Sequence, residues 1–145
     1  MTRYRGVRDP REAGSGQVWV EEIATGMPGE AVQVRALDPR YDLRCHSPDG
    51  FNWGFCGSGS AQLALAILAD ATGNDALALS LYPEFQRHSV GHWRDRWSVA
   101  RDTVQTWVTA RQQHLTAAEQ AALDEREAAA GAGRAAAAAG SHAPR

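Results

Sequence analysis

The sequence contains no lysine, and all 15 of its basic residues are arginine. The two side chains serve solubility in similar ways but differ in hydration and geometry. A coding bias toward GC-rich codons therefore explains the replacement better than fifteen separate physical demands. The alanine- and glycine-rich C-terminal segment fits the same bias. We expect the gene to come from a GC-rich bacterium, or from a phage or plasmid that lives in one.

Cysteine and long apolar segments are also scarce. Two cysteines, Cys45 and Cys56, are too few for a disulfide framework in 145 residues, so we expect free thiols in a reducing compartment. No apolar run is long enough to span a bilayer, and the first residues lack the apolar segment of a secretory signal. We therefore expect a cytoplasmic protein without membrane contact.

The charge is nearly balanced, with 17 acidic and 15 basic residues and a formal net charge of −2. A chain with this balance has no overall nucleic-acid signature, so binding to nucleic acid would require a local basic patch. The length allows one domain with a single hydrophobic core. Alanines near the C-terminus inflate the hydrophobic fraction of 43%, so the core is smaller than the composition indicates.

The N-terminal half has the alternation of a half-buried sheet. Residues 17–23 (QVWVEEI) are β-branched and aromatic, with Val18 and Val20 on one face of a strand and Trp19 on the other. Residues 31–37 (AVQVRAL) alternate apolar with polar side chains, and the turn-forming residues 25–30 (TGMPGE) separate the two segments. This arrangement predicts an antiparallel hairpin. A tight turn is expected at 47–50 (SPDG), followed by a short aromatic strand over 51–55.

Helices are expected in the second half. Residues 61–71 are apolar around nearly the whole circumference of a helix, which predicts a helix that Ser60 opens and that lies at the centre of the domain. A second helix is expected from Asp75 to about Tyr82, because Pro83 must kink the helix or begin a separate turn.

A third helix is expected after an N-cap at Ser98, and Thr116 is expected to cap a final alanine-rich segment. Together these patterns predict a small α+β domain, in which a mostly antiparallel sheet from the N-terminal half packs against about three helices. The domain is expected to span residues 1–115, and residues 116–145 are expected to form an alanine-rich helical or disordered tail.

The glycine- and serine-rich loop before the buried helix is the strongest candidate site. Backbone N–H groups at a helix start lack intrahelical partners and form a partial positive pole, so residues 54–60 (GFCGSGS) are suited to cradle an anion such as a phosphate. A P-loop is excluded because the chain has no lysine, and no G-x-G-x-x-G dinucleotide fingerprint is present. The structural alternative is a tight turn whose glycines allow close packing under Trp53.

Cysteine and histidine side chains allow two further chemistries. Cys56 precedes a helix start that would stabilise its thiolate, and His46 is near in sequence, which permits a cysteine–histidine nucleophile. No third orienting group accompanies the pair, and the alternative is a buried thiol with a histidine that bonds the turn backbone. Cys45, Cys56, His88 and His92 are possible zinc ligands, but the spacing of the cysteines is not that of a zinc site. We expect no metal and no cofactor.

The densest basic and aromatic cluster lies between residues 87 and 101. Tryptophan and arginine are enriched in protein interfaces, and a mixture of cations and aromatic rings also suits a nucleic-acid backbone and its bases. In the structural alternative, the tryptophans cover the core and the arginines solvate its edge, paired with Glu84, Asp95 and Asp102. The cluster consists of Arg87, His88, His92, Trp93, Arg94, Arg96, Trp97 and Arg101.

The motif around the expected central helix resembles that of one family. A histidine is followed by Ser-Pro-x-Gly-Phe-x-Trp-Gly, a Gly-Ser-Gly turn and a Leu-Ala-Leu-x-Ile-Leu helix, with a Tyr-x-x-Phe pair and a tryptophan downstream. Over residues 4–110 the chain is similar to this family of short, uncharacterised phage, plasmid and bacterial proteins, a domain of unknown function. The matching residues are His46, Ser47, Pro48, Gly50, Phe51, Trp53, Gly54, Gly57, Ser58, Gly59, Ala61, Leu63, Ala64, Leu65, Ile67, Leu68, Tyr82, Phe85 and Trp97.

The resemblance implies no assigned reaction, but its setting leads to one functional expectation. We expect a non-enzymatic accessory protein of a phage or mobile element that binds a macromolecular partner, either a host or phage protein or a nucleic acid. A small-molecule or nucleotide-binding domain that uses the loop 54–60 is the alternative, and a cysteine-dependent enzyme is a third interpretation. The expected binding residues are Trp53, Gly54, Phe55, Cys56, Gly57, Ser58, Gly59, Ser60, Arg87, His88, Arg94 and Arg96.

Overall fold

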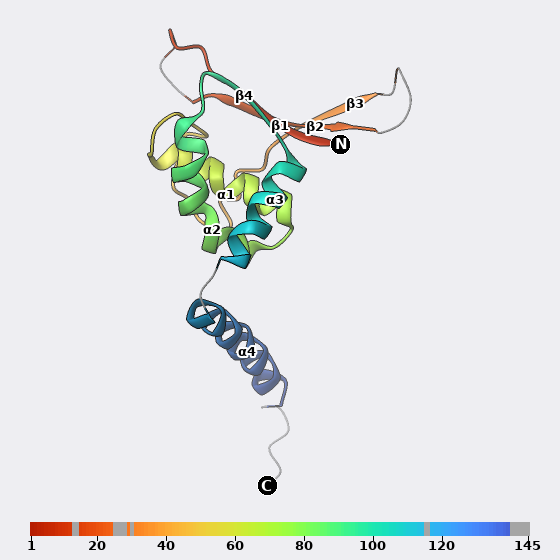
Figure 1. The fold of residues 1–145 in the computed structure, drawn as a ribbon, viewed down its shortest axis with the longest axis vertical. Coiled ribbons are helices and arrows are strands. Elements are labelled where there is room, and N and C mark those ends of the chain that lie inside the picture. The colour runs from red at the N-terminus through yellow and green to blue at the C-terminus, as the bar shows by residue number, and fades with distance from the viewer. Residues whose placement is uncertain (13–14, 25–28, 30, 115–116, 140–145) are drawn as a thin grey trace. The chain divides into compact units, whose positions relative to one another are not determined.

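The computed structural model describes residues 1–12, 15–24, 29, 31–114 and 117–139. The chain divides into two compact units, residues 1–108 and residues 109–145. The predicted domain boundary at residues 115–116 lies outside the described residues. In chain order the elements are β1 (Thr2–Val7), β2 (Gln17–Ile23), β3 (Val32–Ala36), α1 (Ser58–Thr72), α2 (Asp75–His88), the 3-10 helix η1 (Val90–His92), β4 (Arg96–Ala100), α3 (Arg101–Gln113) and α4 (Ala117–Ala139) (Figure 1).

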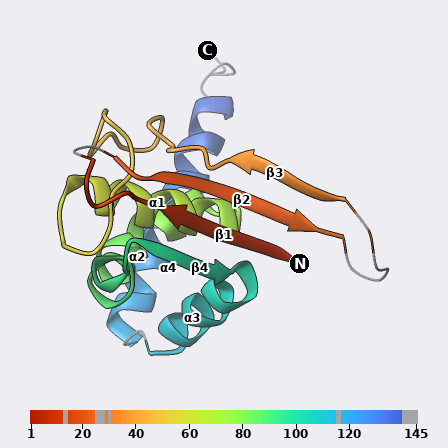
Figure 2. The ribbon, with the colours of Figure 1, turned by 90° about the horizontal axis from the view of Figure 1, so that it is seen from above.

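The sheet of the first unit is antiparallel, with the strand order β3-β2-β1-β4. The hairpin predicted from residues 17–23 and 31–37 is confirmed, with Val34 opposite Glu21 in its register. β4 completes the sheet beside β1, although it follows α1 and α2 in the sequence. Figure 2 shows the sheet lying across α1, with β3 at one edge and β4 at the other. The predicted α+β fold class is therefore confirmed.

Strand β4 corrects the expectation of a helix N-cap at Ser98. Residues 96–100 form a strand, in which half-buried Trp97 and Val99 alternate with exposed residues at the two-residue period of a sheet. The indole of Trp97 lies on Gly6 of β1, where a Cβ atom would stand only 2.3 Å from the ring. Because Gly6 has no side chain, the Trp97 indole packs directly on the backbone of β1, and this contact fixes the register between β1 and β4.

Helix α1 is the centre of the first unit. Its residues from 59 to 69 are all buried, as the apolar pattern predicts. The helix begins at Ser58, two residues before the predicted start at Ser60. It ends at Gly73, whose φ of 63° is a left-handed conformation that glycine adopts without steric cost.

A buried glutamine on α1 fixes the path of the loop between β3 and α1. The Gln62 side chain has no exposed surface, and its amide donates to the carbonyl oxygens of Pro39 (2.6 Å) and Arg44 (3.0 Å). Its oxygen accepts the N–H groups of His46 (2.7 Å) and Ser47 (3.3 Å). Both donors and both acceptor positions are used, so burial leaves no polar group of this side chain unsatisfied.

Helix α2 continues through Pro83 to His88, so the predicted end at Tyr82 is wrong. Pro83 lies at an exposed position, where the carbonyl that loses its N–H partner is able to turn toward solvent. The start of the helix is capped by Asn74, whose side chain accepts the N–H of Leu77 (3.0 Å). The continuous helix therefore carries its last turn, with the basic residues there, next to the start of α1.

Helix α3 contributes Val104 and Val108 to the core of the first unit. The ring of Trp107 contacts Phe85 of α2, with 5.1 Å between the ring centroids. In the second unit, α4 is a separate helix, and its expected cap Thr116 lies outside the described residues. Among the described helices, none combines the length and the apolar character that a membrane crossing requires.

A polar cluster joins the sheet to α1 and α3. The Asp70 carboxylate of α1 accepts hydrogen bonds from the Tyr4 hydroxyl (2.6 Å), Arg101 (2.8 Å) and Arg35 (2.8 Å). Burial by itself raises the pKa of this carboxyl group, but the three donors outweigh burial and hold the pKa of Asp70 below its usual range. Burial and the neighbouring carboxylate raise the pKa of Tyr4, so the phenol stays protonated and donates.

We expect Asp70→Asn to lower the free energy of unfolding at pH 7 by about 2–3 kcal/mol, because two guanidinium groups lose their carboxylate in a half-buried site. The folded-state pKa of Asp70 lies below the unfolded value of about 3.9. The stabilisation is therefore complete at neutral pH and is lost as the pH falls through the folded-state pKa. Urea unfolding from pH 7 down to about pH 3 measures both effects.

The matched control is Asp42→Asn, because Asp42 pairs with Arg40 on the exposed surface. We expect this substitution to have a much smaller effect, since solvent screens the pair. Equal losses in the two variants would contradict the role of the Asp70 cluster. The role would also be contradicted if the loss of unfolding free energy in Asp70→Asn stayed constant as the pH is lowered.

Candidate functional site

The loop before α1 forms a single β-bridge and then turns away from the sheet. Phe51 forms an isolated antiparallel bridge with Gly16, and the residues after it are irregular, so the predicted strand over 51–55 is wrong. The backbone turns at Gly54, whose φ of 86° interrupts an extended strand and favours glycine. The N–H of Gly54 donates to the carbonyl of Val90 (3.0 Å), which ties the loop to η1.

Trp53 holds this loop from within the core. Its side chain has no exposed surface, and its Nε1 donates to the carbonyl of Arg94 (2.8 Å). Its ring meets that of Trp97 edge to face, with 5.7 Å between centroids. On the other side it covers Gly16, where a Cβ atom would lie 1.9 Å from the indole. Trp53 therefore positions the loop and presents no surface of its own to a partner.

Arg8 at the end of β1 binds the same loop through its guanidinium group. It donates to the carbonyl of Trp53 (2.7 Å) and to the side-chain oxygen of Asn52 (2.5 Å). It also pairs with Asp95 (3.0 Å) and lies 5.1 Å from the centroid of the Trp53 ring, a cation–π contact. One cation thus joins β1, the loop and the segment before β4. These partners are far apart in the sequence, so no local pattern indicates this role.

Two polar side chains close the start of α1. Ser60 accepts the N–H of Gly57 and donates to the carbonyl of the same residue, both at 2.9 Å. From α2, the amide of Gln86 donates to the Gly57 carbonyl (2.9 Å) and to the Ser60 hydroxyl (2.8 Å). Gly59 is buried against Asn52. Gly59 and Ser60 therefore shape the loop, while Gly54, Phe55, Cys56 and Ser58 are exposed.

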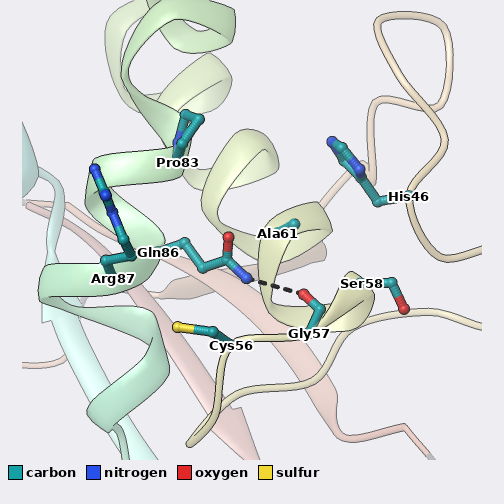
Figure 3. A pocket seen from close by; sticks show the side chains of 8 residues that line it. All are labelled: His46, Cys56, Gly57, Ser58, Ala61, Pro83, Gln86 and Arg87. Atoms are coloured by element: carbon teal, nitrogen blue, oxygen red, sulfur yellow. Dashed lines mark hydrogen bonds between the residues drawn. The ribbon is translucent and has the colours of Figure 1, made fainter.

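A cleft of about 570 Å³ opens between this loop, the last turns of α2 and His46 (Figure 3). The cleft is shallow and wide open to solvent. The leading N–H groups of α1 lie at its side, and such groups form the positive end of a helix dipole. The structure thus brings the predicted loop together with the predicted basic residue Arg87. The lining residues are His46, Cys56, Gly57, Ser58, Ala61, Pro83, Gln86 and Arg87.

An exposed aromatic ring stands in the same loop. The side chain of Phe55 is 52% exposed, although phenylalanine is usually buried. Its ring lies close to Gly57 at the start of α1, where an added Cβ atom would be 2.8 Å from the ring. The loop therefore combines an apolar ring with the positive end of a helix.

Ion pairing separates the arginines of the first unit into two groups. Six of them have a carboxylate partner within 4.0 Å: Arg5, Arg8, Arg11, Arg35, Arg40 and Arg101. Among the described residues of that unit, no carboxylate forms such a pair with the other five: Arg3, Arg44, Arg87, Arg94 and Arg96. Asp95, an expected partner of the basic cluster, pairs with Arg8 instead.

Three of the unpaired arginines belong to segments that build the site. Arg87 lines the cleft, the backbone of Arg94 accepts the hydrogen bond from Trp53, and Arg44 donates to the hydroxyl of Tyr82 (3.2 Å). Arg96 differs, because it lies on the outer face of β4 opposite Val7 and is not part of the cleft lining. Arg87 therefore brings to the cleft lining a cation that has no carboxylate partner among the described residues.

The rest of the predicted basic and aromatic cluster lies around the end of α2. His88 is exposed at the last residue of α2, and His92 is exposed in η1. Trp93 and Trp97 are half-buried and stack on each other, with 4.2 Å between ring centroids. Phe85 meets the ring of Trp93 edge to face. The tryptophans therefore cover the core, as the structural alternative states, while the exposed guanidinium groups around them lack carboxylate partners among the described residues.

His46 lines the cleft beside Tyr82, with 5.1 Å between the two ring centroids. Its Nε2 is buried and has no hydrogen-bond partner among the described residues. Burial, followed by the nearby charge of Arg44, lowers the pKa of His46. The imidazole is therefore neutral at pH 7 and adds no charge to the cleft.

The two cysteines do not assemble a nucleophilic or metal site with the histidines. Cys56 and His46 both line the cleft, but Figure 3 shows the loop residues between them. The Cys56 sulfur instead lies next to Gly91, where an added Cβ atom would be 3.1 Å from it. Cys45 is exposed and is not part of the lining. Among the described residues, no three His, Cys, Asp or Glu side chains gather in a metal-binding group.

We expect Arg8→Lys to destabilise the fold by about 2 kcal/mol, because one ammonium group is unable to serve the Trp53 carbonyl, Asn52 and Asp95 at once. Arg5→Lys on the same strand is the control. Its exposed pair with Glu21 predicts a loss below about 1 kcal/mol. Urea unfolding followed by tryptophan fluorescence measures both variants. Equal effects at the two positions would show that Arg8 does not hold the loop.

Comparison with known proteins gives one match. The model of a family described as "Family of unknown function (DUF6166)" matches residues 4–110, which include both strands of the hairpin, the loop, the cleft and β4. Neither the curated proteins nor the solved structures contain a match to the chain.

Proposed function

The chain belongs to the family of unknown function DUF6166, and we propose that it is a non-enzymatic nucleic-acid-binding protein. In this proposal it serves a phage or mobile element as an accessory protein in the bacterial cytoplasm. The contact surface consists of the loop 54–58, the cleft and the guanidinium groups of Arg87 and Arg94. The observation that carries the proposal is that Arg87, which makes no ion pair with a described carboxylate, lines a cleft beside the start of α1.

The electrostatic argument rests on how charge is distributed. Nucleic-acid affinity comes largely from cations that neutralise phosphates, and the charge of a paired arginine is already neutralised by its carboxylate. Six arginines of the first unit pair with carboxylates, whereas Arg87 and Arg94 are exposed and make no such pair among the described residues. This is the local patch that a chain of net charge −2 requires in order to bind a polyanion.

The loop adds two features that suit an unpaired nucleic-acid strand. The leading N–H groups of α1 are able to donate hydrogen bonds to a phosphate oxygen, and the exposed ring of Phe55 offers a face on which a base can stack. An accessible base requires a single strand, a loop or an end. Single-stranded DNA or RNA is therefore the favoured partner over a regular duplex.

The shape of the cleft favours a macromolecule over a small ligand. Small-molecule sites usually enclose most of the ligand surface, whereas this cleft is shallow and open along its length. A free nucleotide remains the second candidate, because a volume of about 570 Å³ next to a helix start is large enough for one. Thermal melting with mono- and triphosphate nucleotides separates the candidates, since only the second predicts a shift of the melting temperature.

We expect the double variant Arg87→Ala, Arg94→Ala to bind single-stranded DNA or RNA about tenfold more weakly or worse. Each lost phosphate contact reduces the slope of log K against log[salt] by about 0.7, so the double variant loses about 1.4. Fluorescence anisotropy with labelled mixed-sequence strands, measured between about 50 and 200 mM salt, gives both quantities. Thermal melting of the variant checks that the fold is intact.

Arg126→Ala is the control, because it removes one positive charge from α4 in the second unit, as each substitution of the double variant does in the first. We expect its affinity and salt slope to match those of the unaltered chain. The proposal is rejected if none of single-stranded DNA, single-stranded RNA or duplex binds at low salt. It is also rejected if the double variant and the control behave alike.

Phe55→Ala tests the stacking contribution separately from charge. We expect a loss of about 1–3 kcal/mol in affinity for a single strand, with no change in the salt slope, because no phosphate contact is removed. Phe55→Trp is the matched variant and should retain or improve binding. Equal affinities of all three chains would show that no base stacks on this ring.

A further inference from the structure

Strand β3 has the sequence pattern of a covered strand but is uncovered. Val32, Val34 and Ala36 alternate with Gln33 and Arg35, which predicts one apolar face turned away from water. All five residues are nevertheless exposed, and the side chains of Val32 and Val34 are 50% and 55% exposed. These valines are among the most exposed large apolar side chains of the described residues. The mismatch between pattern and exposure indicates a surface that another chain covers.

The outer edge of β3 also carries backbone groups that no described strand pairs with. β3 ends the sheet, with β2 on its inner side only. The N–H and carbonyl of Ile23 bond to Met1, the residue before β1 (2.8 and 2.6 Å), so they point away from β3. Val32, which lies opposite Ile23, therefore forms a non-hydrogen-bonded pair and points its own backbone groups outward. By the alternation of an antiparallel ladder, Val34 and Ala36 do the same.

We propose that β3 pairs in antiparallel fashion with β3 of a second copy of this chain, about a two-fold axis at Val34. In this register Val34 lies opposite Val34 of the second copy, and Val32 lies opposite Ala36. In this register the outward-pointing N–H and carbonyl groups of Val32, Val34 and Ala36 in one copy all face those of the other copy. The pairing joins two four-stranded sheets into one of eight strands, with a self-complementary interface.

The charges of β3 select this register and this partner. With the axis at Val34, the side chain of Gln33 faces Arg35 of the other copy, a pair that is able to form a hydrogen bond. Moving the axis by one residue toward the C-terminal end sets Arg35 opposite Arg35, a repulsive pair. Moving it the other way leaves Ala36 without a partner. The register centred on Val34 therefore satisfies the most backbone groups without opposing like charges.

Pairing by the edge also agrees with the charges on the outer face of the sheet. This face carries Arg3 and Arg5 on β1 and Glu21 on β2, as their register with Val34 and Trp19 shows. Stacking two such faces would bury those charges away from water at high cost. Edge pairing leaves them solvated and places the valines of the two copies side by side. The contact is small, so we expect a weak dimer with a dissociation constant of about 10–100 µM.

The test uses the full chain with Val34→Lys and Val34→Glu. Each substitution sets two like charges directly across the axis, so each variant should raise the dimer dissociation constant at least about tenfold. A one-to-one mixture sets lysine opposite glutamate and should restore dimers. Sedimentation velocity over a concentration series measures the three samples and the unaltered chain. Restoration in the mixture is specific to an axis at residue 34, and a general loss of stability would not produce it.

Ser98→Lys is the matched control, because it adds the same charge to the outer face at the opposite edge of the sheet. It should leave the dimer unchanged. In the unaltered chain, amide exchange of Val34 should slow as the concentration rises through the dissociation constant. The inference is overturned if the unaltered chain is still monomeric at a concentration about ten times the expected dissociation constant. It is also overturned if Val34→Lys leaves the dimers intact. The nucleic-acid proposal does not depend on either result.

Discussion

Burial of helix α1 over residues 59–69 is the constraint on which the rest of the first unit depends. A helix that is buried on nearly every side must satisfy its polar side chains with protein groups. Gln62 therefore fixes the loop that follows β3, Ser60 fixes the turn that precedes the helix, and Asp70 fixes the sheet and the start of α3. Three polar positions on one apolar helix thus determine where three separate segments of chain lie.

The candidate site follows from this arrangement. Because α1 begins inside the core, the chain must enter it through a short turn of small residues, and α2 must pack beside that turn. Gln86 joins the two, and the last turn of α2 brings Arg87 to the cleft. The exposed ring of Phe55 lies in the same loop. Asp95 and Asp70, which could have neutralised nearby arginines, pair with Arg8 and with Arg35 and Arg101. The position of the proposed binding surface thus follows from the way in which neighbouring segments enclose the central helix.

Short-range patterns in the sequence predict the hairpin and α1, since alternation and continuous apolarity are local properties. They fail at β4, where the five residues RWSVA fit a strand or a helix start equally well and packing of Trp97 on Gly6 decides. The sequence also indicates the loop 54–60 as the candidate site. It does not indicate Arg8 or Gln86, whose partners lie far along the chain. The sequence does single out the basic cluster between residues 87 and 101, but no local signal distinguishes a paired arginine from an unpaired one, so the ion pairs become visible only with the fold.

The position of β1 has a consequence for synthesis of the chain. β1 precedes β2, β3 and β4 in the chain and so leaves the ribosome before them, but it lies between β2 and β4 and gains its second neighbour only with residues 96–100. Until then its free edge, with Gly6 not yet covered by the Trp97 indole, is available to other nascent chains. A pause in translation before this point would prolong that exposure, and the non-local closure makes this sheet slow to complete.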